Sequence, residues 1–232
     1  MVLDFFRSPK ESGLDQVEQT MASMITDCRH SFDAAMNALV GGTDPAAVAD
    51  DIRSTDNRIN GDEQEIRREL VVHASVHGSG DVSTILAYML VSRMLERIGD
   101  NAKNIFDLAE EGVDLSDGDD VEQLRSYRDE ISELFATTGA ILDARDSEAA
   151  NEQLERVSEL MREFDDAVRA QVHSDGSAAG AVPRALLARY LKRIVANLGN
   201  VMSSVVLPVD KMDYYAGDGT DADFEESWEE DT

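Results

Sequence analysis

Apolar residues recur every three or four positions along six stretches of the chain, the spacing that places side chains on one face of an α-helix. Glycine-rich or polar segments separate these stretches; Gly41 and Gly42 end the first, and Pro45 opens the second. Aromatic residues make up only 6% of the chain and runs of β-branched residues are short, which disfavours a β-sheet. We therefore predict an all-α fold. The expected helices span residues 14–39, 45–77, 81–112, 120–144, 146–173 and 183–215.

The six predicted helices form two copies of one three-helix unit. Residues of the third helix recur 96 positions later in the sixth: Arg93, Leu95, Arg97, Ile98, Asn101 and Asn104 match Arg189, Leu191, Arg193, Ile194, Asn197 and Asn200. Each unit can bury one stripe per helix, so the duplication predicts two tandem three-helix bundles packed side by side, over residues 14–112 and 118–215. Residues 216–232, which include Phe224 and Trp228, are expected to form a disordered acidic tail.

The charge of the chain excludes some classes of partner. Its 232 residues include 48 acidic and 21 basic ones, for a net charge of −27. Such a surface is unsuited to nucleic acid or anionic lipid, which both require clustered cations. Hydrophobic residues still make up 42% of the chain, enough for a folded core. The excess of acids over lysines resembles the soluble proteins of halophilic archaea that accumulate salt, and in that background paired carboxylates also arise by chance.

Cysteine content and hydropathy predict a cytoplasmic protein. Cys28 is the single cysteine, so an intrachain disulfide is excluded, and its place on the apolar face of the first helix predicts a buried thiol. The first residues lack the basic and apolar regions of a signal peptide. No apolar run approaches the ~18 residues of a membrane span.

Two pairs of polar side chains on neighbouring predicted helices form a candidate metal site. Glu96 and Asp100 lie one turn apart on one face of the third helix, and Asp56 and Asn60 have the same spacing on the second. Oxygen ligands that converge from two antiparallel helices can hold a hard cation or a multinuclear iron cluster. The alternative is that Glu96 and Asp100 are two more solvated acids.

The segment 94–105, Met-Leu-Glu-Arg-Ile-Gly-Asp-Asn-Ala-Lys-Asn-Ile, closely resembles the signature of the PhoU family. The segment from Asp56 to Asn60, followed by Glu63, is similar to the acidic element on the second helix of that family. The resemblance spans residues 14–215 and implies a metal site at Asp56, Asn60, Glu96 and Asp100. The implied cofactor is multinuclear iron or another divalent metal: Fe, Zn, Ni, Ca or Mn.

The second repeat departs from this motif. Lys192 stands where the first repeat has Glu96, and Ala196 where it has Asp100, so the second metal site is expected to be lost. A lysine ammonium can replace a bound cation, and we expect Lys192 to do so against Glu159 or Glu163.

Other polar combinations are weaker candidates. Glu69, His73 and His77 share one helical face at a spacing that could hold zinc, but the two histidines lie at a helix end where the dipole and solvent favour imidazolium. Asp27 and His30 have the spacing of ferritin-like di-iron helices, which require a second such pair that the chain lacks.

The resemblance implies a cytoplasmic regulator of phosphate uptake that is not an enzyme. Proteins of this kind associate with the phosphate ABC transporter, especially its ATPase subunit, and in bacteria also link it to a sensor kinase; a homodimer is expected. Two other functions stay open. The chain could be a degenerate paralogue that acts as a metal-independent scaffold or dimerisation partner of a complete PhoU, or a carboxylate-bridged iron enzyme.

Overall fold

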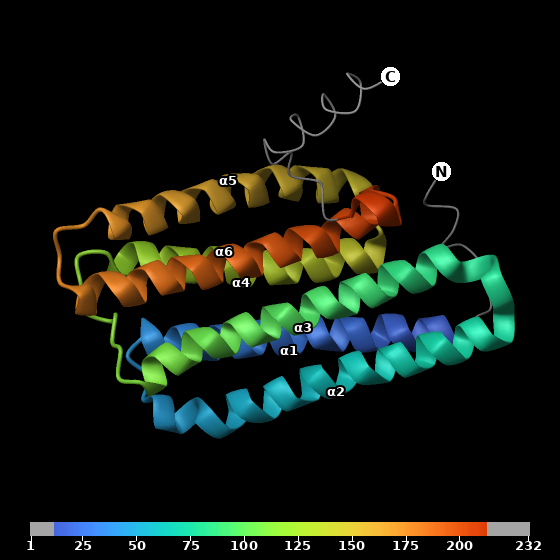
Figure 1. Cartoon of the computed structure of the whole chain (residues 1–232), viewed down its shortest axis with the longest axis horizontal. Helices are drawn as coiled ribbons and strands as arrows, with labels where there is room; N and C mark the ends of the chain where they lie inside the picture. The colour runs from blue at the N-terminus through green and yellow to red at the C-terminus, as the bar shows by residue number, and fades with distance from the viewer. Residues whose placement is uncertain (1–11, 213–232) are drawn as a thin grey trace, which may run out of the picture.

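The computed structural model describes residues 12–212, and this part of the chain is built from helices without any strand (Figure 1). The predicted all-α fold is confirmed. The elements are α1 (Ser12–Leu39), α2 (Pro45–His77), the 3₁₀ turn η1 (Gly78–Asp81), α3 (Val82–Glu110), α4 (Val121–Ala144), α5 (Ser147–Val172), α6 (Ala178–Val206) and the 3₁₀ turn η2 (Val209–Lys211).

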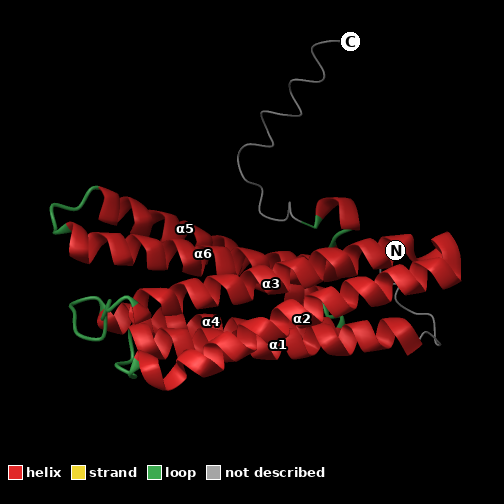
Figure 2. Cartoon of the chain, turned by 60° about the horizontal axis from the view of Figure 1, so that its bottom comes forward, coloured by secondary structure: helices red, strands yellow, loops and turns green. Residues whose placement is uncertain are grey.

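The helices run along the long axis of the molecule in two groups of three. The first three pack on one another, and α6 packs on both α4 and α5 (Figure 1). The groups meet where α3 lies along α6 and α1 lies along α4, so that α2 and α5 are on opposite outer sides (Figures 1 and 2). This is the predicted pair of three-helix bundles, packed side by side.

One hydrophobic core runs through both bundles. Phe32 of α1 and Phe135 of α4 are fully buried, and their ring centroids are 5.7 Å apart across the boundary between the bundles. Removing a buried ring of this kind costs about 3–5 kcal/mol in general. The two repeats therefore depend on each other for stability.

Helix ends follow from local sequence, with one exception. Asp44 caps α2 by accepting a hydrogen bond from the Ala46 amide (3.0 Å), immediately before Pro45 at the first helical position. The predicted bounds of the sixth helix, 183–215, are wrong at both ends. The helix begins at Ala178, with Pro183 inside it, and stops at Val206, because Leu207 precedes a proline and takes an extended conformation.

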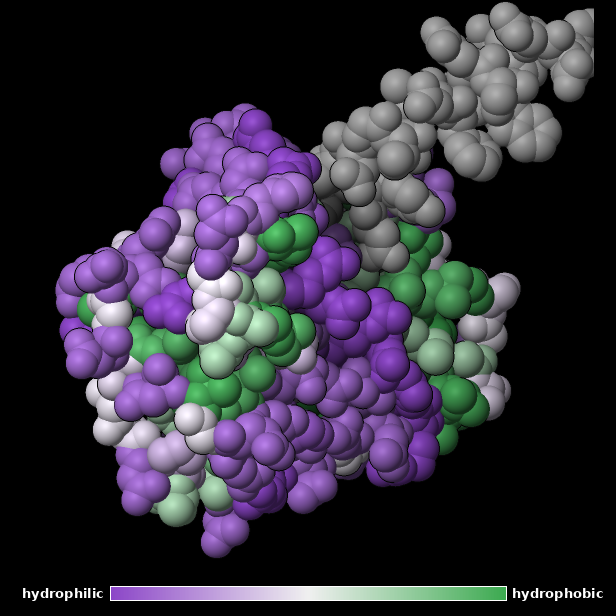
Figure 3. Space-filling model, turned by 60° about the vertical axis from the view of Figure 1, so that its left-hand side comes forward, coloured by the Kyte–Doolittle hydropathy of each residue, from purple (hydrophilic) through white to green (hydrophobic). Residues whose placement is uncertain are grey.

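Apolar side chains are exposed at the ends of two helical hairpins. Figure 3 shows one face of the molecule, on which patches of hydrophobic residues interrupt a mostly hydrophilic surface. The large exposed ones are Val71, Val72, Val76, Val82 and Leu86 around the α2–α3 turn, and Val172, Val182 and Leu186 around the α5–α6 turn. Val76 and Val172, like Leu86 and Val182, are 96 positions apart, so both repeats expose apolar residues at matching places.

Two predictions concern the C-terminal end of the chain and the limits of the repeats. The acidic tail of residues 216–232, with Phe224 and Trp228, lies outside the described residues, and the boundaries 14–112 and 118–215 stay predictions. None of the helices between Ser12 and Val206 combines the length and apolar composition needed to cross a bilayer.

Candidate metal centre

The predicted site lies on the seam between α2 and α3. These helices approach closely at Gly99, where an added Cβ would lie 3.0 Å from the Ile59 Cδ1 atom. A larger residue at this position would therefore require the Ile59 side chain to shift. The close approach brings polar side chains of the two helices together on both sides of Gly99.

On one side of Gly99, two buried glutamates share the positive charge of one arginine. Glu63 of α2 is 5% exposed and Glu96 of α3 is 8% exposed. The Arg93 guanidinium lies 2.7 Å from Glu96 Oε1 and 3.8 Å from Glu63 Oε1. Arg67 donates a hydrogen bond to Glu63 Oε1, at 2.5 Å. Both glutamates therefore have a protein cation beside them.

Glu96 is nevertheless not fully compensated. Its second oxygen, Oε2, is buried without a hydrogen-bond partner. Burial, followed by repulsion from Asp100 and Glu63, raises the pKa of Glu96 although Arg93 acts in the opposite direction. A buried carboxylate oxygen without a partner is costly, and a bound cation would relieve that cost.

On the other side of Gly99, the predicted ligand Asp56 is already paired. Its Oδ2 accepts a hydrogen bond of 2.9 Å from Lys103 Nζ of α3. Burial alone lowers the pKa of Lys103, but the hydrogen bond and charge of Asp56, with Asp100 and Asp107 nearby, outweigh it, so the pKa is raised. The ammonium of Lys103 therefore stays charged beside Asp56.

The four predicted residues thus lie along one seam and do not form one closed cluster. Asp100 is close enough to affect the pKa of both Glu96 and Lys103 and so connects the two sides. Asn60 is half-buried on α2. Within residues 12–212, no three His, Cys, Asp or Glu side chains are already grouped as metal ligands. The unpartnered oxygen of Glu96 fits a single divalent cation that competes with Arg93, and the arrangement does not supply the ligands of a multinuclear iron cluster.

Sequence reasoning did not place the cations Arg93 and Lys103 of this seam, and it noted Glu63 only as following the acidic element of α2. Glu63 lies two turns after Asp56 on the same helical face, which was a usable signal. Arg93 lies one turn before Glu96, and Lys103 lies inside the motif itself, but the partner that a cation chooses on another helix depends on packing. The helical spacing of residues therefore does not predict which acids these cations pair with.

In the second repeat, Lys192 supplies an internal cation, as predicted, but to a different partner. Its ammonium lies 2.6 Å from Asp165 Oδ2 of α5, and Ala196 is half-buried on the same helix. The predicted partners Glu159 and Glu163 were wrong because Arg156, one and two turns away on α5, binds both of them at 3.0 Å.

Arg156 also joins α5 to α4. Its Nε donates a hydrogen bond of 2.6 Å to Glu130 Oε1. This hydrogen bond is the main reason why the pKa of Arg156 is raised, with smaller contributions from Glu159 and Glu163. One guanidinium therefore contacts all three of these carboxylates.

The histidines at the end of α2 form a protein-only cluster. His73 is buried, contrary to the expectation that it faces solvent, and its Nε2 lies 3.0 Å from Asp81 Oδ2. The His73 and His77 rings stack with centroids 4.1 Å apart. Glu69 Oε2 is buried without a hydrogen-bond partner, but these residues are not grouped as metal ligands. The helix turn buries His73 because Asp81 is available to pair with it.

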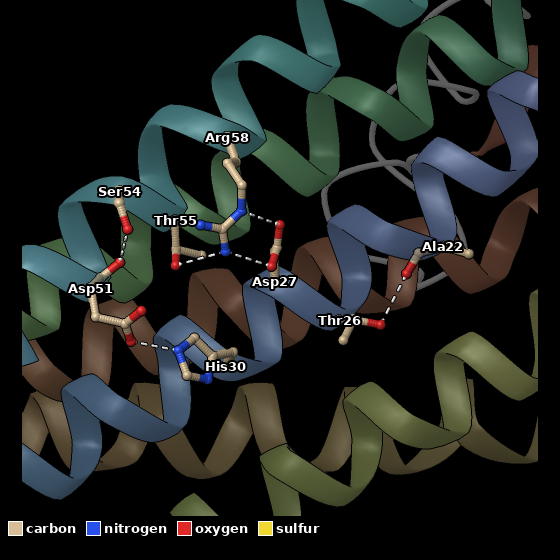
Figure 4. A network of polar contacts seen from close by, with 8 residues as sticks. All are labelled: Ala22, Thr26, Asp27, His30, Asp51, Ser54, Thr55 and Arg58. Atoms are coloured by element: carbon tan, nitrogen blue, oxygen red, sulfur yellow. Dashed lines mark hydrogen bonds and ion pairs between the residues drawn. The ribbon is translucent and has the colours of Figure 1, made fainter.

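The spacing of Asp27 and His30 has a structural explanation (Figure 4). Arg58 of α2 donates to both oxygens of Asp27, at 2.9 and 3.2 Å. His30 Nε2 lies 2.5 Å from Asp51 Oδ2, also on α2. Both side chains therefore tie α1 to α2, and each has a partner other than a metal.

Cys28 is a core thiol, as predicted. It is fully buried, its Sγ lies 3.2 Å from the Leu95 carbonyl oxygen, and burial raises its pKa far above the usual range. The thiolate that a nucleophile would need is therefore strongly disfavoured.

Comparison with known proteins agrees with this architecture. The family model described as the PhoU domain matches residues 21–109, which contain the whole α2–α3 seam. Residues 21–109 of this chain therefore resemble a PhoU domain. The fold is also that of a solved member, the crystal structure of PhoU from Pseudomonas aeruginosa, with a TM-score of 0.73 and 21% sequence identity. That alignment covers 84% of this chain and 96% of the other. A comparison with curated proteins gives no match.

The match to the PhoU domain covers less than half of the chain. The matched residues lie in the first repeat, which also holds Glu96 and Asp100 of the family motif.

Proposed function

We propose that this chain is a PhoU-family regulator that acts as a cytoplasmic adaptor of a phosphate ABC transporter. It binds the ATPase subunit at the membrane periphery and lowers phosphate uptake when phosphate is plentiful. A divalent cation in the first repeat sets its affinity for the transporter, which requires that the cation bind the two states of the adaptor unequally. The observation that supports this most is the buried, unpartnered oxygen of Glu96 inside the matched domain.

The cation would be held by Glu96 and Asp100 of α3, with Asp56 and Asn60 across the seam. A set of oxygen donors favours hard ions such as Ca²⁺ or Mn²⁺, although iron, zinc and nickel remain within the proposal. The metal would contact the Glu96 oxygen that has no hydrogen-bond partner. Since Asp56 is paired with Lys103 and Glu96 with Arg93, metal binding competes with ion pairs inside the protein.

Apolar surface at the hairpin ends supports a protein partner. Val72 and Val76 at the α2–α3 turn are 62% and 71% exposed. Apolar side chains at the centre of an interface contribute much of the energy of protein association. We propose that the ATPase subunit covers this end. A sensor kinase and a second copy of the chain are other partners that the family implies.

Metal content after purification in molar salt without chelators tests the cation. We expect one divalent ion per chain in the wild type and none in the double variant Glu96→Gln/Asp100→Asn, with the helical circular dichroism unchanged. The matched control is Glu159→Gln/Glu163→Gln in the second repeat, which should retain the metal. A wild-type protein without iron, zinc, nickel, calcium or manganese above trace would refute the metal-dependent proposal.

Capture of transporter subunits from cells grown in high and low phosphate tests the adaptor. The wild type should retain the ATPase subunit in a phosphate-dependent manner. Val72→Asp/Val76→Asp should lose it, whereas an exposed polar change far from that end, Asp166→Asn on α5, should not. Failure of the wild type to retain the ATPase subunit under both conditions would contradict the proposal.

A metal-independent scaffold is the second candidate function. It is favoured by the cations that the protein supplies itself, Arg93 and Lys103 in the first repeat and Lys192 in the second. Such a scaffold would bind a complete PhoU protein and carry no metal. Co-purification with a PhoU paralogue, together with absence of metal, would favour it over the adaptor.

A further inference from the structure

A cavity of about 380 Å³ opens between the two repeats. Residues of α1, α3, α4 and α6 line it, so both bundles contribute to its walls. Sites for small molecules have volumes of roughly 300 to 1,000 Å³. The cavity is therefore large enough for a small organic molecule and too large to be a packing defect.

The inner walls are apolar. They are formed by Met21, Ile25, Val91, Leu142 and Val205. On α4, an added Cβ at Gly139 would have Ile25 as its nearest neighbour, at 3.9 Å, so this glycine leaves space inside the cavity. An occupant needs an apolar body to fill it.

A partly buried polar network borders the cavity. Tyr88 of α3, which is 6% exposed, donates a hydrogen bond to Glu18 of α1. Arg145, the residue that ends α4, donates to the same carboxylate at 2.5 Å. Arg145 holds a left-handed backbone conformation with φ of 54°, and no other non-glycine residue among 12–212 has a positive φ. This conformation is unfavourable for residues other than glycine. It places the guanidinium where α1, α3 and α4 meet.

The charged groups around the cavity are mainly acidic. Asp15, Glu18 and Asp143 carry three carboxylates, against the single guanidinium of Arg145. Since Arg145 is paired with Glu18, the acids that remain are Asp15 on α1 and Asp143 on α4, both exposed at the rim. A cationic head would be attracted there, and a carboxylate would be repelled.

We propose that this cavity binds an organic cation: a primary ammonium on an apolar body, with the body between the two repeats and the ammonium beside Asp143 and Asp15. Such a ligand contacts both bundles and stabilises their packing. The residues that line the cavity are different from those of the metal seam, and the proposal does not depend on the transporter function.

Three probes of one shape test this. Titration calorimetry at constant ionic strength compares 4-phenylbutylammonium, 4-phenylbutanol and 4-phenylbutyrate. We expect saturable binding of the cation, about tenfold tighter than that of the carboxylate, with the alcohol between them. The order of the three affinities is set by the charge of each probe. Raising the salt concentration should therefore reduce the differences in affinity and leave the affinity of the alcohol unchanged.

Variants locate the site. Gly139→Leu and Ala22→Leu each place a side chain into the cavity from a different helix, and either should weaken all three probes at least tenfold while the circular dichroism is unchanged. Asp143→Asn should reduce only the preference for the cation, and Asp166→Asn on distant α5 should change nothing. Two cavity-filling variants are used so that the test still stands if one of them does not fold. The proposal is overturned if no probe saturates, if cation and carboxylate bind equally, or if every correctly folded filling variant binds like the wild type.

Discussion

The α2–α3 seam of the first repeat and the α5–α6 seam of the second occupy matching places and treat charge in opposite ways. In the first, Glu96 is buried, its pKa is raised and one of its oxygens has no partner. In the second, Lys192 occupies the matching position and lies 2.6 Å from Asp165. At this position the first seam has a buried carboxylate with an unpartnered oxygen, whereas the second has a cation that is paired within the protein.

The first seam can therefore bind a cation from solution, whereas in the second seam the side chain of Lys192 is the cation. A buried charge without a partner is costly and persists where a ligand can compensate it. The second repeat keeps the three-helix architecture with Lys192 and Ala196 at the positions of Glu96 and Asp100. Substitutions that make one seam resemble the other test this interpretation.

Gly99→Val is expected to have the largest effect on stability. Valine is chosen because Val195 is the matching residue of the second repeat. The new side chain would overlap Ile59, whose Cδ1 lies 3.0 Å from the position that a Cβ would take, so α2 and α3 must move apart. We expect a loss of about 1–3 kcal/mol in the free energy of unfolding, measured by urea denaturation. Gly61→Ala, where an added Cβ meets nothing within 4 Å, should instead stabilise α2. Equal stability of Gly99→Val and the wild type would show that the seam is loosely packed.

Lys192→Glu gives the second seam the residue of the first. The new carboxylate would face Asp165 without a cation, and we expect a loss of about 1–2 kcal/mol at neutral pH, less than for a fully buried pair because both partners are partly exposed. Acidification should recover part of the loss as the carboxylates protonate. Lys192→Met, which removes the charge alone, should lose less.

The same variant, Lys192→Glu, also tests whether a single glutamate restores metal binding in the second repeat. Glu159 and Glu163 stay with Arg156, so we expect no second metal ion in Lys192→Glu by elemental analysis. A second bound ion would show that the new glutamate alone restores the site, against this expectation.

Lys103→Gln removes an internal competitor from the first seam. Its pair with Asp56 is partly exposed, so the stability lost should be only about 0.2–1 kcal/mol. With Asp56 released, a divalent cation should bind about tenfold more tightly in a calorimetric titration. Lys211→Gln, on the exposed η2 turn, is the control. Unchanged metal affinity in Lys103→Gln would exclude Asp56 as a ligand.

The smallest effect on stability is expected from Glu96→Gln, and its sign depends on pH. Because the folded state raises the pKa of Glu96, folded chains bind its proton more readily than unfolded ones, and stability falls as pH rises through that window. In metal-free protein, the variant should therefore be slightly more stable than the wild type near pH 7. This advantage should disappear below the ordinary pKa of glutamate, as measured by urea denaturation across pH. A variant that is less stable at pH 7 would show that Arg93 outweighs burial.

Much of the site could be predicted because helical spacing is local. Glu96 and Asp100 lie on one face of α3, and Asp56 lies on the antiparallel neighbour, as the i, i+4 pattern indicated. Lys192 was expected to act as an internal cation, and it does. Its partner was predicted wrongly because Arg156 of the same helix α5 pairs with Glu159 and Glu163, and the packing of α6 on α5 brings Lys192 to Asp165 instead.

By itself, the sequence determined the all-α class, the duplication and the motif, since each depends on repeated local spacing along one helix or between two copies of it. Tertiary structure alone decided which cation pairs with Asp56, that Glu96 keeps an oxygen without a partner, and that a cavity lies between the repeats. These features join residues of different helices. Their distances depend on side-chain packing in the shared core, which the order of residues along one helix does not contain.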